Sequence, residues 1–457
     1  MTLPTIRNRS RDAVRNEWAA KAATARWASN LVGTGILARP QTTNKRLRLK
    51  LAKLWDQWTE ECDADDVLDL YGIQTLVAEN WIEAGEVFVR LRWRRLEDGL
   101  SAPLQLQVLE SEMVPLFDAD HGPDLPRGHY VRAGIEFNAI GRRVAYWMHR
   151  EHPGDARVGG GIGLHDLRRV PAQDVLHIYK PQRPGQLRGV SEFAGILPKL
   201  RGVGDFDDAV LERQKLANLF AAFITSPPVG GDGAIDPVTG EALETDYSGV
   251  PMAGLEPGTS QHLMPGEDVR FSEPPDAGAN YGDFMRYQHQ HVAAGANLPY
   301  ELLTGDVRGV SDRTLRVVIL EFRRLCQQRQ WQILVPQLCR KVRNAWAQAC
   351  LVAGTLTAAE AAEARRVEWA PQGWDYRHPV QDVDARIKEV RAGLKTRSSA
   401  ILEKGDDPWQ VEQEMYDDNA RADKLGLVLD SDPRTIGKGV RVATATKDDT
   451  DPSDDEE

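Results

Sequence analysis

The sequence predicts an α+β fold made of several subdomains, and three observations support this prediction. A chain of 457 residues is too long for one compact core, so about two to four subdomains are expected. Segments with helical apolar spacing outnumber those with the alternating spacing of strands, which gather between residues 86 and 179. The longest helical pattern follows an extended loop at residues 305–311 and is typical of a strut, not of a pocket wall.

The composition is that of a folded protein whose two ends carry opposite charge. A hydrophobic fraction of 41% and a charged fraction of 27% suit a soluble globular chain. Residues 1–50 hold 11 Lys and Arg against 2 Asp and Glu, whereas residues 401–457 hold 7 against 17. This asymmetry favours different partners at the two ends. Because residues 448–457 have no apolar anchor, we expect residues 431–457 to form a disordered acidic tail.

The cysteines and the apolar runs indicate a reducing, cytoplasmic environment. The four cysteines have no CxxC spacing and no histidine nearby, so we expect thiols that serve as small core residues: Cys62, Cys326, Cys339 and Cys350. No apolar run approaches the roughly 18 residues of a membrane span. The polar N-terminus does not have the pattern of a signal peptide. We expect no membrane contact, no metal and no cofactor.

The first part of the chain predicts helices followed by strands. A basic segment precedes a helix over Arg11–Leu31, which Gly33 and Gly35 stop, and two further helices are expected over Leu47–Cys62 and Val67–Ala84. Four segments then share the alternating spacing of strands and hairpins: Glu86–Trp93, Pro103–Leu109, Tyr130–Met148 and Val175–Tyr179.

Two helices are expected to bracket an irregular insert. Helical character returns at Ser191–Leu200, and after Gly202 and Gly204 we expect a first bracketing helix with Asp205 as its N-cap, running to Phe223. The second covers Tyr281–Ala296. Between them, residues 225–262 are rich in Pro, Gly and acids, and Leu263–Phe271 predicts a turn and a strand.

A long amphipathic helix begins at Asp312 and spans roughly 36 Å. Its apolar stripe and its basic opposite face are listed together here: Leu315, Val318, Ile319, Phe322, Leu325 and Cys326 against Arg313, Arg316, Arg323, Arg324 and Arg329. Pro336 predicts a kink, after which a second amphipathic segment runs from Leu338 to Val352. Helices are expected beyond it over Asp382–Gly393, Thr396–Lys404 and Pro408–Gly426.

Residue patterns that could support catalysis are weak. His289 and His291 stand two apart on a helix, a spacing that points their rings in different directions. Ser191 lacks the GxSxG elbow of an acyl-transfer nucleophile. A metallonuclease could draw on one group of loop residues whose spacing matches no motif: His149, His152, Asp155, His165 and Asp166. The patterns favour a non-enzymatic protein, with a metal-dependent nuclease as the alternative.

Short motifs spread over residues 9–428 resemble the lambda-type portal protein family of tailed bacteriophages. They are Arg11–Asn16, Leu31–Ile36, Gly85–Val89, Gly141–Tyr146, His152–Asp155, Val170–Ala172, Val175–His177, Pro184–Gln186, Arg188–Val190, Leu263–Glu267 and Leu298–Asp306. Each motif is short, but their order and spacing together are specific. One departure is Val310-Ser-Asp-Arg-Thr314, where the family pattern has an Asn-Tyr-Ser-Ser-type sequence, so the contact made there does not carry over.

The resemblance implies a homo-oligomeric ring, twelve subunits in the family, at one vertex of a capsid. Double-stranded DNA would pass through it non-specifically, packaged by the terminase large subunit and later ejected. Further implied partners are a head-completion or adaptor protein, tail proteins, the major capsid protein and the scaffolding protein. The implied location is the virion, with assembly in the host cytoplasm. Another minor capsid or adaptor protein is a further alternative.

The resemblance also implies a portal fold with a mixed α/β wing, a helical stem, a small α/β clip and a mostly helical crown. The implied segments are the N-terminal basic segment and helix 1–39, the wing 40–204, the first stem helix 205–224, the clip 225–275, the second stem helix 276–304, the tunnel loop 305–311, the long wing helix 312–336, the crown 337–430 and the tail 431–457.

Site residues follow from the same resemblance. In the stem they are Asp205, Phe206, Val210, Arg213, Phe220, His289 and His291; at the clip, where terminase or an adaptor would bind, Pro265, Gly266, Glu267 and Asp268; in the tunnel loop, Gly305, Asp306, Val307, Arg308, Gly309, Val310 and Ser311. A net charge of −11 suits a channel that conducts a polyanion without holding it. Arg308 is equally consistent with a DNA contact and with an ordinary exposed loop residue.

Overall fold

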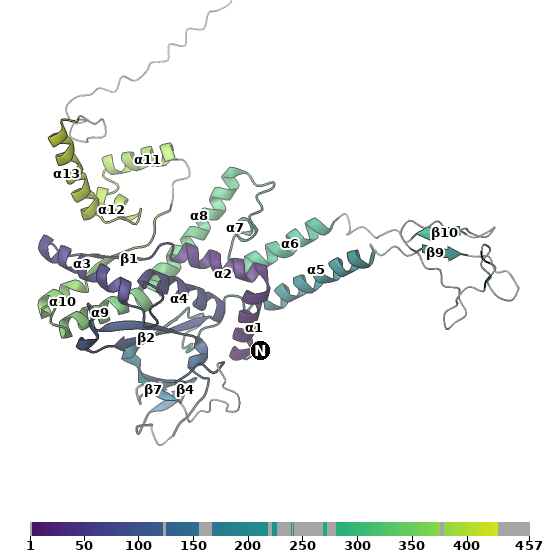
Figure 1. The fold of residues 1–457 in the computed structure, drawn as a ribbon, viewed down its shortest axis with the longest axis horizontal. Helices are drawn as coiled ribbons and strands as arrows, with labels where there is room; N and C mark the ends of the chain where they lie inside the picture. The colour runs from purple at the N-terminus through teal and green to yellow at the C-terminus, as the bar shows by residue number, and fades with distance from the viewer. Residues whose placement is uncertain are drawn as a thin grey trace, which may run out of the picture.

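The computed structural model describes residues 2–121, 125–154, 167–217, 222–225, 239, 241, 268–271, 280–374 and 379–427. A central body of helices and sheets carries two projections (Figure 1). Helices α5 (Leu197–Ala217) and α6 (Tyr281–Gly295) project on one side, and α11 (Pro379–Arg391), α12 (Arg397–Leu402) and α13 (Pro408–Leu425) lie above the body. The three C-terminal helices confirm the sequence prediction.

The first predicted helix is two helices in the structure. α1 (Leu3–Asn16) begins earlier than expected, and α2 (Trp18–Leu31) follows it. Glu17 separates them with an extended backbone, φ −105° and ψ 116°. The break lets both helices pack against each other and against α4 (Leu70–Ala84), which one straight helix could not do.

The remaining helices of the body are close to their predicted bounds. α3 covers Lys45–Glu61 and is capped by the Asn44 side chain, and α4 is capped by Asp69. α4 ends at Gly85, whose φ of +90° lies in the left-handed region. A Cβ at Gly85 would come within 2.2 Å of the Val190 carbonyl carbon. Only glycine allows this turn and this close approach together.

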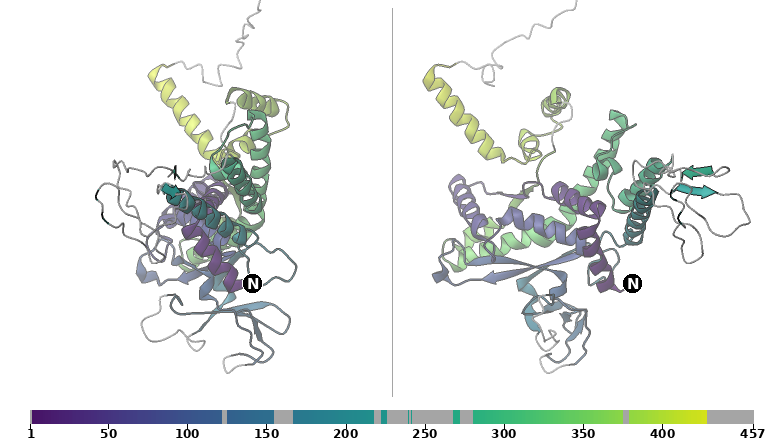
Figure 2. Two further views of the ribbon diagram at one scale, coloured as in Figure 1. Left: turned by 90° about the vertical axis from the view of Figure 1, so that its right-hand side faces the viewer. Right: turned by 45° about the vertical axis from the view of Figure 1, so that its right-hand side comes forward.

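Two antiparallel sheets make up most of the strand structure. The three-stranded sheet has the order β3 (Leu104–Leu109), β2 (Glu86–Trp93), β8 (Val175–Tyr179). The four-stranded sheet contains β4 (Tyr130–Arg132), β5 (Ile135–Phe137), β6 (Arg143–Met148) and β7 (Arg168–Pro171) in that order. Figure 2 shows the second sheet at the end of the body away from the C-terminal helices. The strand predictions between residues 86 and 179 are confirmed.

Two buried clusters lie on opposite faces of β2. Val87, Val89 and Leu91 belong to the larger cluster, whereas Phe88 belongs to the smaller one under the four-stranded sheet. This division follows from the alternating direction of side chains along a strand. The larger cluster holds four fully buried tryptophans: Trp27, Trp58, Trp81 and Trp346.

Residues far apart in the chain close the larger cluster. β1 (Leu37–Pro40) pairs antiparallel with β11 (Val367–Ala370), and α10 (Ala358–Ala364) packs on α9 (Arg340–Val352). The four cysteines are buried free thiols, as predicted. Burial raises the pKa of Cys62, Cys326 and Cys339 to about 12, so these thiols stay neutral and pack as small apolar groups.

The long helix continues through Pro336 without a break in helical structure. α8 (Asp312–Arg329) leads into η5 (Gln330–Cys339), a π-helical segment that contains Pro336, and then into α9. The Arg340 N–H bonds to the Val335 carbonyl, five residues back. The wider turn accommodates the proline ring and its missing N–H. The expected interruption is therefore a π-helical segment within one continuous helical run.

Arg329 corrects the predicted basic face of this helix. It is 2% exposed, its guanidinium lies 3.8 Å above the Trp27 ring, and it donates to Glu192 at 3.1 Å. Helical spacing alone placed it on the solvent face, but the turn around residue 329 is covered by α2, so the charge is buried against an aromatic ring and an acid.

The first bracketing helix also differs from the prediction. α5 starts at Leu197 and runs through Gly202, Gly204 and Asp205, so Asp205 lies inside the helix and is not its N-cap. Glycine costs a helix only about 1 kcal/mol, which continued helical hydrogen bonding can offset. Phe223 lies in a strand, β9 (Ala222–Thr225), which pairs antiparallel with β10 (Asp268–Phe271).

A buried charged network joins the two sheets. Glu86, at the start of β2, accepts hydrogen bonds from Arg188 Nε (2.7 Å), from the Gly189 N–H (2.7 Å) and from His177 Nε2 (2.9 Å). Arg188 also donates to three backbone carbonyls, those of Ser111, Val114 and Ala133. Every oxygen of the Glu86 carboxylate is therefore paired, which a buried charge requires.

The protonation states of this network follow from its geometry. Burial opposes ionisation of Glu86, but Arg188 and His177 outweigh burial and lower the Glu86 pKa to about 2. Burial lowers the His177 pKa to about 4. His177 Nδ1 faces the Arg143 guanidinium at 3.4 Å, which can only donate. The neutral ring therefore carries its proton on Nε2 and donates it to Glu86.

Candidate functional site

The loop at residues 305–311 is held at both ends by helices. α7 (Tyr300–Thr304) stops at Gly305, which has φ +75°. Ser311 caps α8 by accepting a hydrogen bond from the Thr314 N–H at 3.2 Å. Val307, between these anchors, is 56% exposed. The loop therefore presents its middle residues to solvent from two fixed ends.

Asp306 is the centre of the contacts inside this loop. Its carboxylate accepts from Arg308 Nε (2.8 Å), Arg308 Nη2 (3.0 Å) and the Tyr300 hydroxyl (2.9 Å). The hydrogen bonds from Arg308 hold the pKa of Asp306 well below its usual range. Arg286 of α6 adds a second link, because its Nη2 donates to the Arg308 carbonyl at 2.8 Å.

These contacts change how Arg308 is interpreted. Its side chain is exposed, but its charge is already neutralised by a two-point contact with Asp306. The sequence suggested an unpaired cation beside a polyanion or an ordinary loop residue. The structure instead shows an ion pair on the loop surface, so the loop offers no net positive charge through Arg308.

The two projecting helices touch through aromatic side chains. Phe206 of α5 lies 4.8 Å from Phe284 and 6.4 Å from Tyr281 of α6, measured between ring centroids. The Tyr281 hydroxyl donates to Asp207. Asp205 pairs with Arg201 on the same helix, Arg213 is exposed and Val210 is partly buried. Phe220 lies outside the described residues.

The two histidines on α6 lie apart, as their spacing predicts. The His289 ring contacts Trp18 of α2, edge to face, with a centroid distance of 5.0 Å, and burial lowers its pKa. His291 is exposed. The base of α6 is tied to the body, because the Trp27 indole donates to the Ala296 carbonyl at 2.9 Å.

The predicted insert is described only at its base. The pairing of β9 with β10 sets Thr225 opposite Asp268. Pro265, Gly266 and Glu267 lie outside the described residues.

Apolar side chains lie exposed along the helices that leave the body. Leu211 of α5 is 54% exposed, Tyr287 of α6 is 65% exposed, and Val317 of α8 is 64% exposed. Phe284 and Leu320 are exposed on the same helices. Large apolar residues gathered on projecting helices indicate surfaces that another chain covers.

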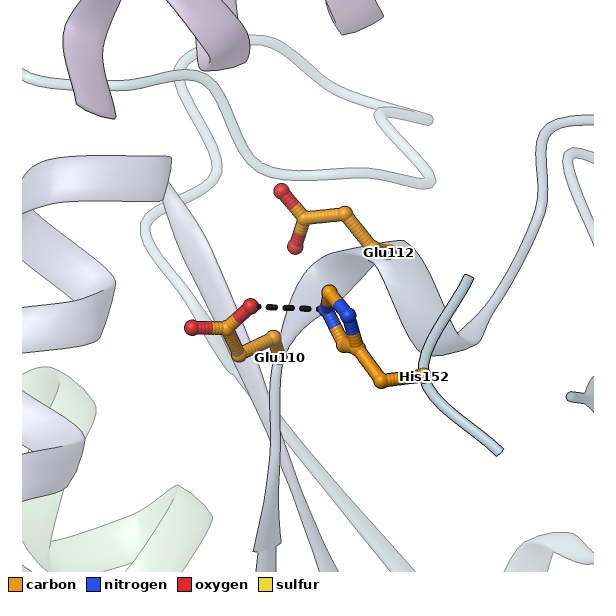
Figure 3. Close-up of side chains that lie close together, drawn as sticks. All are labelled: Glu110, Glu112 and His152. Carbon is orange, nitrogen blue, oxygen red and sulfur yellow. Dashed lines mark ion pairs between the residues drawn. The ribbon is translucent and has the colours of Figure 1, made fainter. Parts of the chain in front are cut away.

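One group of side chains has the geometry of a metal site. Glu110, Glu112 and His152 offer ligand atoms within 4.8 Å of one another (Figure 3). Both carboxylates already bind arginines of α1: Arg11 contacts Glu110 at 2.9 Å and Glu112 at 2.8 Å. His152 Nε2 lies 2.9 Å from Glu110.

This arrangement fits a structural clamp better than a metal centre. Arg11 sits where a cation would bind, and Arg7 adds a second positive charge 2.9 Å from Glu112. The clamp fixes α1 to the body. Asp155, His165 and Asp166, the other residues of the nuclease alternative, lie outside the described residues. The Glu110–Glu112 pair was not identified from the sequence, although its i, i+2 spacing beside a histidine-containing loop is a usable signal.

No helix among the described residues is both long enough and apolar enough to cross a membrane.

Comparison with known proteins identifies one family. Residues 1–330 match the family model described as phage portal protein, lambda family. The chain is 25% identical over 470 residues to the probable portal protein of Halomonas phage phiHAP-1, covering 99% of this chain and 86% of that protein. It is 21% identical over 304 residues to portal protein B of Escherichia phage lambda, covering 61% of this chain and 56% of that protein.

A similar solved structure comes from the neck of a native gene transfer agent particle. The identity is 14% and the TM-score 0.46, and the alignment covers 85% of this chain and 91% of that chain.

Proposed function

This chain belongs to the lambda family of phage portal proteins, and we propose that its copies form a ring of twelve at one capsid vertex. Double-stranded DNA would pass through the centre of that ring, inward when terminase packages it and outward on ejection. The role is structural: the chain provides a channel wall and attachment surfaces. Such a head-to-tail contact closes into a ring when its rotation divides a full turn.

The observation that carries this proposal is the exposed apolar surface of the projecting helices. Val317 and Leu320 on α8 and Tyr287 on α6 are each more than half exposed. Burying one such side chain against a neighbour contributes about 1.5–3 kcal/mol. Because these residues lie on different projections, a neighbouring copy on either side covers them more simply than one symmetric dimer contact does.

We propose that α5 and α6 form the stem and that the loop 305–311 faces the lumen. The aromatic contacts of Phe206 with Tyr281 and Phe284 support α5 and α6 acting as one unit. The pairing of β9 with β10 supports a clip that begins and ends beside the stem. The clip, residues 225–275 with Pro265–Asp268, would bind terminase and later a head-completion or adaptor protein.

The proposed wing is larger than its sequence-based bounds. Leu338, Trp346 and Trp369 belong to the same buried cluster as Trp58 and Trp81. We therefore propose that the wing includes residues up to Ala370 and that the crown consists mainly of α11–α13. Capsid and scaffolding proteins would meet the wing, and assembly would take place in the host cytoplasm before the protein enters the virion.

Native mass spectrometry and negative-stain electron microscopy of the purified chain test this proposal. Rings with a central opening wide enough for a DNA duplex are expected. Because some rings require high concentration or a scaffolding protein, the measurement is made over a concentration series and with scaffolding protein added. Monomers under every one of these conditions would contradict the proposal.

A further inference from the structure

A pocket of about 270 Å³ lies between the two sheets and is lined by positive side chains. We call it the basic pocket. Its basic residues are Arg90, Arg92, Arg150, Arg168 and His149. No acidic residue lines it among the residues that the structure describes. Four arginines around one small volume are unusual, because each like charge raises the cost of the others.

The sequence places these arginines together through strand alternation and register. Phe88, Arg90 and Arg92 point to the same face of β2, and Phe88 begins the smaller buried cluster on that face. Arg168 of β7 stands opposite Met148 of β6 in the four-stranded sheet. The basic pocket therefore opens where the apolar contact between the sheets ends.

The arginines of the basic pocket lack the partners that other arginines of this protein have. Within the described part of the chain, Arg90, Arg150 and Arg168 form no ion pair or side-chain hydrogen bond, and Arg92 reaches only Gln107, at 3.5 Å. By contrast, Arg188 and Arg329 each contact a buried glutamate.

Nearby charges confirm that the cluster is mutually repulsive. Burial lowers the pKa of Arg90, and Arg92 and Arg168 lower it further, while Asp174 offsets this in part. A protein that holds such a cluster gives up stability at this place. Stability given up at one surface site is typical of a binding function.

We propose that the basic pocket binds acidic side chains from a segment of a partner protein. Guanidinium groups bind carboxylates through paired hydrogen bonds. The lining also includes Leu109, Met113 and Met148, and methionine and leucine side chains suit contact with an apolar residue next to the acids. A DNA duplex carries its phosphates on a convex surface too wide to enter so small a pocket.

The position of the basic pocket supports a protein partner. It lies beside the four-stranded sheet, away from the loop 305–311 and from the projecting helices (Figures 1 and 2). The surface is therefore separate from the one that we propose for DNA. The inference does not require ring formation, and both outcomes can be measured on the same sample.

Fluorescence anisotropy with a labelled synthetic peptide of alternating glutamate and leucine tests the proposal. The wild-type chain is expected to bind this peptide more tightly than a DNA duplex of equal charge. The variant Arg90→Gln with Arg168→Gln should bind the peptide at least about tenfold more weakly, because two charge-assisted contacts are lost. The control, Arg127→Gln with Arg142→Gln, removes the same charge from exposed positions of the same region and should leave binding within about twofold.

A second measurement separates a binding role from a structural one. Because the pocket arginines repel one another, Arg90→Gln with Arg168→Gln should raise the Tm of the unliganded protein. A lower Tm would show that these arginines stabilise the fold and would overturn the proposal. Tighter binding of DNA than of the peptide, or no binding of either, would also overturn it.

A third variant asks whether the chain fills the basic pocket itself. Asp155 and Asp166, in the segment between β6 and β7, lie outside the described residues. Asp155→Asn with Asp166→Asn should leave peptide binding unchanged. A gain of about tenfold or more would show that these acids occupy the pocket in place of a partner. Native mass spectrometry of each variant reports ring formation independently, so failure of one proposal is distinguishable from failure of the other.

Discussion

The central body and the projecting helices differ in where they place their large apolar side chains. In the body, Trp58, Trp81 and Trp346 are fully buried, and a buried acid is matched by an arginine and a histidine. On α5, α6 and α8, large apolar residues are more than half exposed. The difference teaches that one chain suffices to build the body, whereas the projections need surfaces that other copies supply.

The largest effect is expected from breaking the network inside the body. Arg188→Ala removes the main partner of Glu86 and leaves a buried carboxylate uncompensated, at a cost of about 3–5 kcal/mol in the free energy of unfolding. Urea denaturation followed by circular dichroism measures this. Arg183→Ala, at an exposed neighbouring position, should change the value by less than about 0.5 kcal/mol. Equal effects at the two sites would remove the distinction between body and surface.

The second effect concerns pH and the same network. The His177 pKa is lowered from 6.5 to about 4 in the folded chain. Between these pH values the unfolded chain binds a proton that the folded chain does not, so stability falls as pH falls from about 6.5 to about 4. The loss should reach roughly 3 kcal/mol.

His177→Gln should flatten this part of the pH profile, as measured by urea denaturation at several pH values. His121→Gln, at an exposed position, should keep the wild-type slope. A slope that survives in His177→Gln would assign the pH dependence to other groups.

The third effect should appear in the projections and spare the body. Val317→Glu with Leu320→Glu places charges where a neighbouring copy would pack and should weaken each subunit contact by at least about 2 kcal/mol. Sedimentation velocity should show loss of rings, while the unfolding transition stays within about 0.5 kcal/mol of wild type. Ile140→Glu, an exposed apolar site on the body, serves as the control. Rings that persist in the double variant would place the subunit contact elsewhere.

The smallest effect is expected at the loop. Asp306→Asn frees Arg308 from its ion pair, so each subunit gains an unpaired positive charge. Binding of duplex DNA to the assembled ring should become tighter and more salt-dependent, by about one counterion per contact made. Arg308→Gln in addition should return the salt dependence to the wild-type value. If Asp306→Asn leaves it unchanged, the loop does not contact DNA in the ring.

Local signals explain most of what the sequence predicted correctly. The left-handed glycine after α4, the alternation along β2 and the helical spacing of α8 each arise from residues close together in the chain. The network could not be predicted, because Arg188 lies 102 residues from Glu86 and His177 lies 91 residues from it. A glutamate at the start of an apolar strand was the only hint.

The errors have the same physical origin. Arg329 fits the polar face of α8 by spacing, and only the presence of Trp27 and Glu192 reveals that it is buried. Asp205 is a good N-cap residue by type, but α5 had already begun eight residues earlier, at Leu197. In the candidate site, the loop residues were identified, whereas the Asp306–Arg308 pairing depends on the turn at Gly305, which residue type alone does not fix.

The π-helical segment around Pro336 has a mechanical consequence. It joins α8 to α9 without a break, and α9 ends among the tryptophans of the body. A push or pull at residues 305–311 is therefore carried along one rod into the most rigid part of the chain. A flexible hinge at the proline would have absorbed that force, whereas the widened turn transmits it.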